Sequence, residues 1–558
     1  MRIPEVGLVL LGALASACSQ GSITFSLDLP APKLSPLSDL RAASITIVDE
    51  STGAPLGPSV GVHDQGRSAL GNVHIGTYDL DMQVGGGGLL LGLARSRGVT
   101  IAAGVDQQVT LYLRKPFAFF GALPLFGTAP SAVMAFDTTL PPGGIEPDLG
   151  NIQLPASMSA SASTFDGRFL FIAAKDHLYV VNTADLTTLS HVAATGGMIR
   201  AIVVAPNDHA AALLTDGEID LISDLAAFDS SGPAASPLVP IALANPIAAA
   251  FSPDGETLAV ISGLGTWDSI AALTKSSWQS CNGSIPKTSL SMISVAAPPA
   301  IASPVPLPNG ATDVNWIAKR PVVTLPCGAG AVFVDDLTDL ANLPVAIAGH
   351  GVLDLAVSGD RTAIIEGRIV NKMVPVDPEE PRVTNALLPF GQITILDPNG
   401  TVTSTFPLPT DQLDFNGSDM TVVQARLAPI RIDAYDIALS PDGTHVVMAG
   451  RMRYEANAFP YVPEFADPNV SGLTYYCDLN LSEDVYHVME IEATSGSVAY
   501  QSVTGVNDSV CSTQCFSCVR PCHDCQPSCT PLTNPERTSC TVSNGYPPGG
   551  LSVMMGGE

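Results

Sequence analysis

Residues 439–447 of the chain read LSPDGTHVV, and this stretch decides the fold. The proline fixes φ at the first corner of a turn, the aspartate bonds to the turn backbone, and the glycine accepts a positive φ. Apolar residues lie on both sides of the turn, and the run after it suits a buried inner strand. The stretch therefore predicts a strand, a tight turn and a second strand.

The same unit recurs along the chain. Four other copies read FDGRFLFIA, APNDHAAAL, FSPDGETLAV and VSGDRTAI, and they start at residues 165, 205, 251 and 357. The turn residues Asp166, Asn207 and Asp254 are 41 and 47 residues apart. The next gap, of 106 residues to Asp360, leaves room for two units, and the last, to Asp442, is 82 residues. A period in the forties is typical of a four-stranded propeller blade.

Second hairpins follow where a blade requires them, around residues 177–182, 217–222, 392–400 and 486–491. These SPDG turns and alternating xIxIxD strands resemble the β-propellers of the YVTN and TolB-like families over about 350 residues. The resemblance concerns turn chemistry, so it implies an architecture and no activity. Six blades are recognisable, and residues 120–154 are available for a seventh or for a closing strand. An open array of sandwiches is the alternative.

The start of the chain has the pattern of an export signal. Arg2 is followed by an apolar run from Val6 to Leu14 and then by small residues up to Cys18. The run LASAC resembles the lipobox of bacterial lipoproteins, although Ala15 stands where leucine is usual. The resemblance implies that residues 1–17 are a signal peptide and that Cys18 carries acyl chains such as palmitate. Ser19 implies sorting to the outer membrane of a Gram-negative bacterium. The alternative is an ordinary secretory signal whose cysteine joins a disulfide.

The rest of the chain divides by pattern into three parts. Residues 18–115 contain alternating strands and are expected to form a small β-sandwich, in which the GTYDL motif at 76–80 resembles immunoglobulin-like or carboxypeptidase-regulatory-like modules. Residues 116–505 are expected to form the propeller, and residues 506–558 a cysteine-rich tail. The expected fold is therefore all-β. Inserts at 371–390 and 408–429 are too long for simple turns.

Composition limits the function. Among 558 residues, 25 are Lys or Arg and 53 are Asp or Glu, which gives a net charge of −28. Such a surface repels a phosphate backbone, so nucleic acid is excluded as an expected partner. After the signal region no run of about 18 apolar residues occurs, so the lipid at Cys18 is the only expected membrane attachment.

The cysteines point to disulfides. Without Cys18 there are ten, an even number that can pair fully in an oxidising compartment. Two lie in the blade region and eight in or near the tail, and their pairing stays open: Cys281, Cys327, Cys477, Cys511, Cys515, Cys518, Cys522, Cys525, Cys529 and Cys540. The two C-x-x-C pairs of the tail suggest a metal site instead, but their spacing fits neither zinc, a ferredoxin cluster nor a c-type haem. No metal or cofactor is expected.

No catalytic residues are apparent. The nine histidines form no HExxH pair, and the chain has no GxSxG elbow. His177 and His445 are expected within blade strands, and His209 in a solvated turn. A lipid-anchored propeller that acts as a binding or scaffolding platform, for an envelope protein or a glycan, is therefore favoured over an enzyme. The alternative is a lactonase-like propeller hydrolase with its site in the central channel, which leaves no local motif. A purely structural envelope component is a third possibility.

Overall fold

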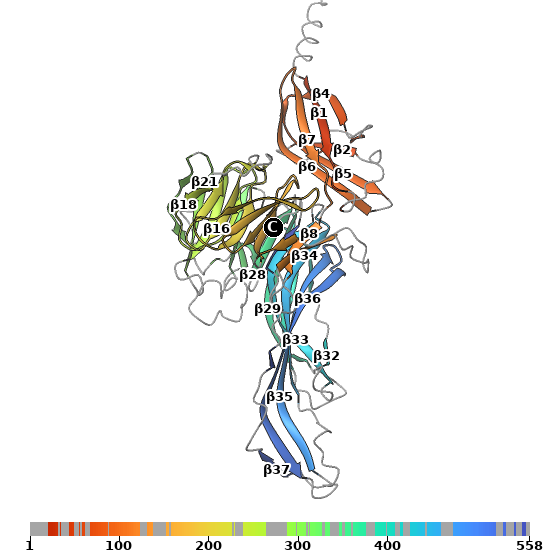
Figure 1. Ribbon diagram of the computed structural model, residues 1–558, viewed down its shortest axis with the longest axis vertical. Coiled ribbons are helices and arrows are strands. Elements are labelled where there is room, and N and C mark those ends of the chain that lie inside the picture. Colours follow the sequence, from red (N-terminus) through yellow and green to blue (C-terminus); the bar gives the residue numbers. More distant parts are fainter. Residues whose placement is uncertain are drawn as a thin grey trace, which may run out of the picture.

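The computed structural model describes an all-β chain (Figure 1). The described residues are 20–31, 34, 44–49, 55, 59–61, 67–86, 89–115, 117–122, 131–137, 152–155, 158–225, 228, 238–263, 287–296, 298–307, 311, 313–317, 319–325, 330–334, 345–348, 352–358, 361–374, 386–397, 399–407, 413–416, 424–440, 443–458, 473–519, 528–531, 541–542 and 549–553. Within these ranges no helix has the length and apolar character needed to cross a bilayer.

Residues 20–115 form an N-terminal domain of two sheets, with strand orders β4-β1-β7 and β3-β2-β5-β6. Its strands are β1 (Gln20–Asp28), β2 (Ser44–Asp49), β3 (Val60–Gly61), β4 (Arg67–His74), β5 (Gly76–Gly86), β6 (Leu89–Ile101) and β7 (Asp106–Tyr112). One hydrophobic core takes residues from both sheets, among them Phe25 of β1 and Leu80 of β5. The alternating pattern predicts this well, since polar and apolar residues of β1 alternate between half-buried and buried.

Seven further sheets follow, which we number as blades 1 to 7. Blade 1 contains β39 (Gly549–Val553), β8 (Phe117–Ala122), β9 (Ser131–Asp137) and β10 (Ile152–Leu154). Blade 2 contains β11 (Met158–Ser163), β12 (Phe169–Ala174), β13 (His177–Asn182) and β14 (Thr187–Ala193). Blade 3 contains β15 (Ile199–Val204), β16 (Ala211–Thr215), β17 (Ile219–Ile222) and β18 (Leu238–Ile241). Blade 4 contains β19 (Pro246–Phe251), β20 (Thr257–Gly263), β21 (Thr288–Ser294), β22 (Ala300–Ile301) and β23 (Val305–Pro306).

The remaining blades continue this order. Blade 5 contains β24 (Asp313–Ile317), β25 (Arg320–Leu325), β26 (Gly330–Phe333) and β27 (Val345–Ala348). Blade 6 contains β28 (Val352–Ser358), β29 (Arg361–Val374), β30 (Ala386–Leu396) and β31 (Val402–Pro407). Blade 7 contains β33 (Gln424–Leu439), β34 (His445–Ala458), β35 (Leu473–Glu492) and β36 (Val498–Val519). Three short strands pair outside the blades: β32 (Leu413–Asn416), β37 (Ser528–Pro531) and β38 (Thr541–Val542).

The innermost strands of these blades form a closed ring. In the order β39, β11, β15, β19, β24, β28, β33 each strand contacts the next, and β33 contacts β39. The chain is therefore a β-propeller, and the alternative of an open sandwich array is wrong. Residues 117–154 supply three strands of blade 1, and the innermost strand of that blade is β39, from the end of the chain.

Two predicted boundaries differ from the observed ones. Strand β36 runs from Val498 to Val519 without a break at residue 505, and β39 returns to the propeller. The segment 506–558 is therefore not separate from the propeller, because its first and last parts pair with blade strands. The gap of 82 residues before Asp442 is one blade step lengthened by long hairpins.

The repeated turns have the predicted geometry. Gly167, Gly255 and Gly443 have φ values of 73°, 74° and 65°. In each case the glycine N–H donates to the carbonyl three residues earlier. In the second copy Asp208 takes the place of the glycine, with φ 55°. A left-handed conformation costs a non-glycine residue on the order of 1 kcal/mol, so another interaction of Asp208 must offset this cost.

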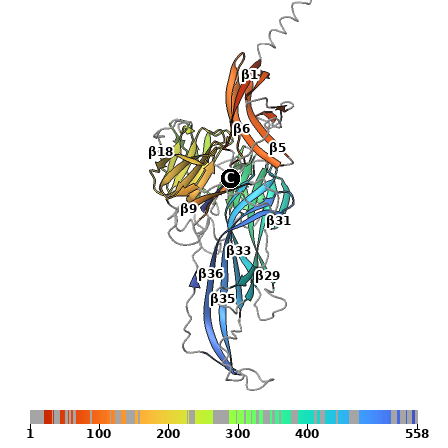
Figure 2. The ribbon, with the colours of Figure 1, turned by 45° about the vertical axis from the view of Figure 1, so that its right-hand side comes forward.

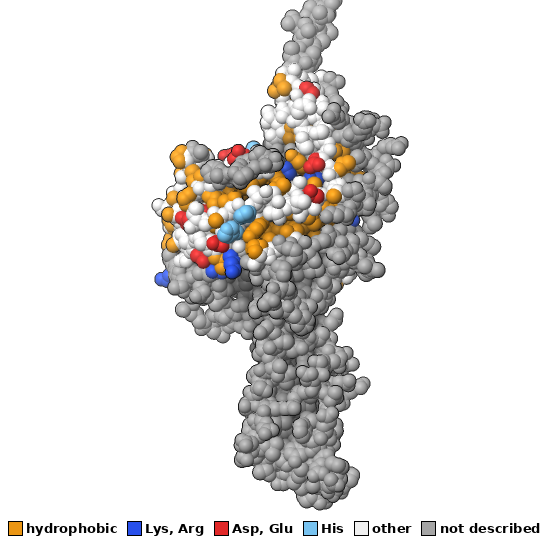
Figure 3. Space-filling view, viewed as in Figure 1, with side chains coloured by type: hydrophobic (Ala, Val, Ile, Leu, Met, Phe, Trp, Pro, Cys, Tyr) orange, Lys and Arg blue, Asp and Glu red, His pale blue; other side chains and the backbone are white. Residues whose placement is uncertain are grey.

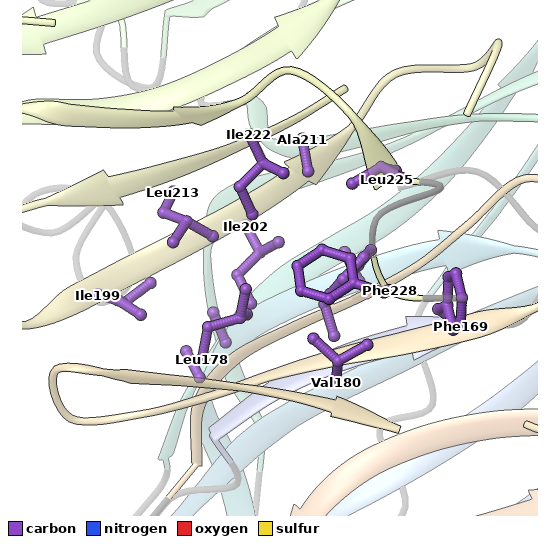
Figure 4. Close-up of a cluster of buried hydrophobic side chains, with 14 residues drawn as sticks. Phe169, Leu178, Val180, Ile199, Ile202, Ala211, Leu213, Ile222, Leu225 and Phe228 are labelled. Atoms are coloured by element: carbon purple, nitrogen blue, oxygen red, sulfur yellow. The ribbon is translucent and has the colours of Figure 1, made fainter. Parts of the chain in front are cut away.

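Apolar side chains fill the space between neighbouring blades. Figure 4 shows Leu178 and Val180 of blade 2 pointing toward Ile199 and Ile202 of blade 3. Phe228 completes this layer, with its ring 6.4 Å from that of Phe169. The fully apolar run of β12 predicts such burial on both faces, because a blade strand packs against a blade on either side.

Blades 6 and 7 extend beyond the ring as a stalk, formed by the outer parts of β29, β30 and β33–β36 together with β32, β37 and β38 (Figures 1 and 2). The 22 residues of β36 span about 70 Å, whereas a six-residue blade strand such as β12 spans about 20 Å. The predicted inserts at 371–390 and 408–429 contribute to it. Both views place the N-terminal domain and the stalk on opposite sides of the propeller.

Candidate functional site

A buried arginine joins the N-terminal domain to blade 2. Arg114 follows β7 and is 1 % exposed. Its guanidinium donates to the Asp28 carboxylate (2.9 Å) and carbonyl (3.0 Å) on one side, and to the Thr183 hydroxyl (2.8 Å) on the other. The Thr183 hydroxyl then donates to the carbonyl oxygen of Arg168 (2.9 Å). Arg114 thus connects the end of β1 with two turns of blade 2.

Aromatic rings add to this joint. The guanidinium of Arg97 lies 3.8 Å from the centroid of the Phe165 ring, and that of Arg95 lies 5.3 Å from it. Both arginines belong to β6, whereas Phe165 is in the first turn of blade 2. The Tyr112 ring contacts Arg168 in the same way at 5.2 Å. Each such contact contributes about 0.5–2 kcal/mol, depending on how far it is desolvated.

The joint also has an apolar part. The N-terminal domain contributes Leu34 and Leu93 to a core that contains Phe117 and Phe119 of blade 1 and Leu170 of blade 2. The two bodies therefore share one core, and a shared core opposes relative motion of the two bodies.

Asp208 connects the turns of successive blades. Its carboxylate accepts hydrogen bonds from the backbone N–H groups of Phe165 (2.7 Å) and Asp166 (2.8 Å). On the other side, the Asn207 side chain donates to the Asp254 carbonyl (2.8 Å). A Cβ at Gly255 would lie 2.4 Å from Asn207, so this close approach requires glycine. The bonds of Asp208 are the interaction that offsets its positive φ.

Burial and the neighbouring carboxylate of Asp166 raise the pKa of Asp208 well above its ordinary value. Burial also raises the pKa of Asp166, which the Arg168 guanidinium partly opposes. A raised folded-state pKa means that the folded protein takes up a proton before the unfolded chain does. This pair therefore adds stability as the pH falls through the raised values toward about 4, and that contribution is absent at higher pH.

Asp208→Ala is expected to lower the unfolding free energy of the propeller by about 2 kcal/mol, because two backbone N–H groups lose a charged acceptor. The loss should grow between pH 8 and pH 5, since only the wild type gains from protonation of Asp208. Calorimetry at several pH values measures both effects. His209→Ala is the matched control, because His209 is the exposed neighbour. A constant difference across this range would contradict the pKa assignment.

The other end of blade 3 has its own polar cluster. Asp220 is buried and accepts hydrogen bonds from the Thr195 N–H (2.7 Å) and from the Thr195 hydroxyl. Glu218 also accepts from that hydroxyl (2.6 Å), and Arg200 pairs with Asp216 (2.6 Å). These bonds hold the connection from blade 2 to blade 3.

The histidines lie as predicted. His177 begins β13, His445 begins β34, and His209 is exposed in its turn. His177, Tyr179 and His191 form a row of rings on the outer strands of blade 2, with Tyr179 stacked on His191 at 6.0 Å. Figure 3 shows a group of histidine side chains on the surface of the blades. Among the described side chains no three or more His, Cys, Asp or Glu residues gather as metal ligands would.

The predicted lipid and disulfide residues are only partly visible. Cys18, Cys281, Cys327, Cys522, Cys525 and Cys540 lie outside the described residues. The other five lie on stalk strands with a described backbone: Cys477 on β35, Cys511, Cys515 and Cys518 on β36, and Cys529 on β37. Lipidation and pairing therefore stay predictions. The joint around Arg114 was missed, because a lone arginine after a strand gives no local signal.

Comparison with known proteins adds little beyond the fold. No family model matches the chain, and no curated protein matches it. Among solved structures, Kuenenia stuttgartiensis hydrazine synthase is similar at 18 % identity over 58 % of this chain and 70 % of its own, with a TM-score of 0.27. A functionally unknown protein from Desulfotomaculum acetoxidans DSM 771 is similar at 12 % identity over 70 % and 98 %, with a TM-score of 0.38.

The β-propeller domain of Myceliophteria thermophila Cps50 is similar at 10 % identity over 65 % of this chain and 95 % of its own, with a TM-score of 0.36. Because these TM-scores lie below 0.5, the propeller assignment is drawn from the ring of inner strands. These proteins give no argument about activity.

Proposed function

We propose that this chain is a lipid-anchored cell-envelope protein whose propeller and stalk form a binding or scaffolding platform. The observation that carries the proposal is the opposite placement of its two ends. The N-terminal domain is fixed to one end of the propeller, and the long hairpins of blades 6 and 7 project from the other. An attachment at one end and an extended structure at the other suit presentation of a binding surface away from a membrane.

The blade topology explains this arrangement. In an antiparallel blade the first and third turns lie at one end, and the second turn lies at the other. The N-terminal domain bonds to the first and third turns of blade 2, through Phe165 and Thr183. The stalk extends the second hairpins of blades 6 and 7, between β29 and β30 and between β34 and β35. The two parts therefore leave opposite ends of the ring.

The anchor follows from the export signal. Strand β1 begins at Gln20, two residues after Cys18, so a diacylglycerol thioether at Cys18 would hold the N-terminal domain against the bilayer. We propose that this domain is an immunoglobulin-like β-sandwich that acts as a spacer. Ser19 supports an outer-membrane address. The acidic chain favours an envelope protein or a glycan as the partner, with nucleic acid excluded by charge.

The test begins with Cys18→Ser, which is expected to move the protein from the membrane fraction to the soluble fraction, because the acyl chains are lost. The purified variant is then incubated with isolated outer membranes and cell-wall sacculi. A folded reporter domain inserted between Ala458 and Leu473, at the stalk end, is expected to block saturable binding. The same reporter inserted between Gly61 and Arg67, in the N-terminal domain, is the matched control and should leave binding intact.

Two results would overturn the proposal. Retention of the Cys18→Ser variant in the membrane would refute the lipid anchor. Equal binding by both reporter variants, together with chelator-sensitive hydrolysis of a lactone, would favour the channel hydrolase.

A further inference from the structure

The stalk brings cysteines together in facing positions. In the antiparallel ladder of β35 and β36, Cys477 lies directly opposite Cys515. In the ladder of β36 and β37, Cys518 lies directly opposite Cys529. These are positions along the backbone, set by the pairing of neighbouring residues on both sides, such as Tyr476 with Phe516.

A third pair follows from the ladder of β36 and β38. Val510 lies opposite Thr541, and Ser509 lies opposite Val542. In an antiparallel pair, one step forward on one strand matches one step backward on the other. The next step from Val510 and Thr541 therefore joins Cys511 with Cys540.

The dimensions of a sheet select these pairs over others. A disulfide needs Cα atoms about 4.4–6.8 Å apart, and residues directly opposite each other in an antiparallel ladder are about 4.5–5.5 Å apart. Cys511 lies four residues from Cys515 along β36, which is about 13 Å. Cys518 lies three residues from it, which is about 10 Å. Cys477 is therefore within disulfide reach of Cys515 and of neither other cysteine on β36.

We propose that the stalk is crosslinked by three cross-strand disulfides, Cys477–Cys515, Cys518–Cys529 and Cys511–Cys540. This resolves most of the roughly one hundred pairings that eight cysteines allow. Each bond forms between two thiols with loss of two protons and two electrons. The electrons reduce the disulfide of a thiol oxidant, such as a protein disulfide donor or oxidised glutathione, to two thiols. In the cell this chemistry rests on the proposed export to an oxidising compartment.

The crosslinks have a clear structural role. Strands β35 and β36 continue as a narrow ribbon far from the propeller, and narrow ribbons are only marginally stable in water. The three bonds hold β36 to a partner strand on each side, through β35, β37 and β38. The stalk thereby becomes a stiff projection.

The pairing is tested on mature protein carrying Cys18→Ser and oxidised in glutathione buffer. Cys477→Ser, Cys529→Ser and Cys540→Ser are each expected to raise alkylation from near zero to one label per molecule, at Cys515, Cys518 and Cys511 respectively. Mass spectrometry of the digested protein locates the label. Cys281→Ser is the matched control and should label none of these three residues. A label on a different cysteine overturns the pairing.

A second measurement covers variants that fail to fold. In the unreduced parent protein, chymotryptic cleavage after Phe516 separates Cys515 from Cys518, so the peptide with Cys477 should be linked to the first and not to the second. Protein recovered from cell envelopes separates the two proposals. If all its cysteines are reduced while the glutathione-oxidised protein has the expected pairs, the pairing stands and export fails. If disulfides are present with other partners, export stands and the pairing fails.

Discussion

Ending the chain at Pro548 is expected to open the propeller ring. The truncation removes β39, the innermost strand of blade 1, which pairs with β8 and contacts β11 and β33. Its ladder with β8 pairs four residues of β39, so hydrogen bonds alone account for about 4 kcal/mol, and the packing loss adds to this. Thermal unfolding should start at a clearly lower temperature, and the exposed strand edges should promote aggregation.

The matched control ends the chain at Val553, which removes residues 554–558 and keeps β39. This variant should unfold like the full chain. Equal thermal stability of the two truncated proteins would show that closure by the end of the chain contributes nothing.

Arg114→Ala is expected to separate the N-terminal domain from the propeller. The change removes donors to Asp28 and Thr183 and leaves a cavity at a side chain that is 1 % exposed. We expect a loss of about 3 kcal/mol, the range found when a buried, hydrogen-bonded charge loses its partner. Asp28 is 44 % exposed and can be solvated, which limits the loss. In calorimetry the N-terminal domain should unfold in a separate, earlier transition.

Arg200→Ala is the control for this change. Arg200 also pairs with an aspartate, Asp216, but the two side chains are 28 % and 42 % exposed. Exposed pairs contribute under about 1 kcal/mol, so the unfolding profile should change little. A similar loss in both variants would mean that the Arg114 joint has no special role.

The sequence predicts the parts of the fold that repeat. Copies of a turn with proline, aspartate and glycine indicate hairpins wherever they occur, because each residue type acts within its own turn. The ring closure could not be found in this way. Strand β39 is five residues long and has no turn motif, and its partner β8 lies more than 400 residues earlier in the chain. The stalk was also missed, since strand extension depends on a partner strand.

The same limit applies to the candidate sites. Cysteine spacing predicts crosslinks, but the partners of Cys477 and Cys518 depend on strand register, which is a three-dimensional property. The second turn copy, with Asp208 in the glycine position, looks like a weak repeat in the sequence. In the structure this departure has a purpose, because only a side chain at that position can bind the backbone of Phe165 and Asp166.

Closure by the last residues also sets the timing of folding. During synthesis β8 is among the first propeller strands to emerge from the ribosome, and its ladder partner β39 is the last. Until translation is complete, blade 1 has an open edge that can pair with another growing chain. The full ring is therefore a post-translational product, and a chain stalled shortly before its end should be recognised as unfinished by proteases that act on exposed strands.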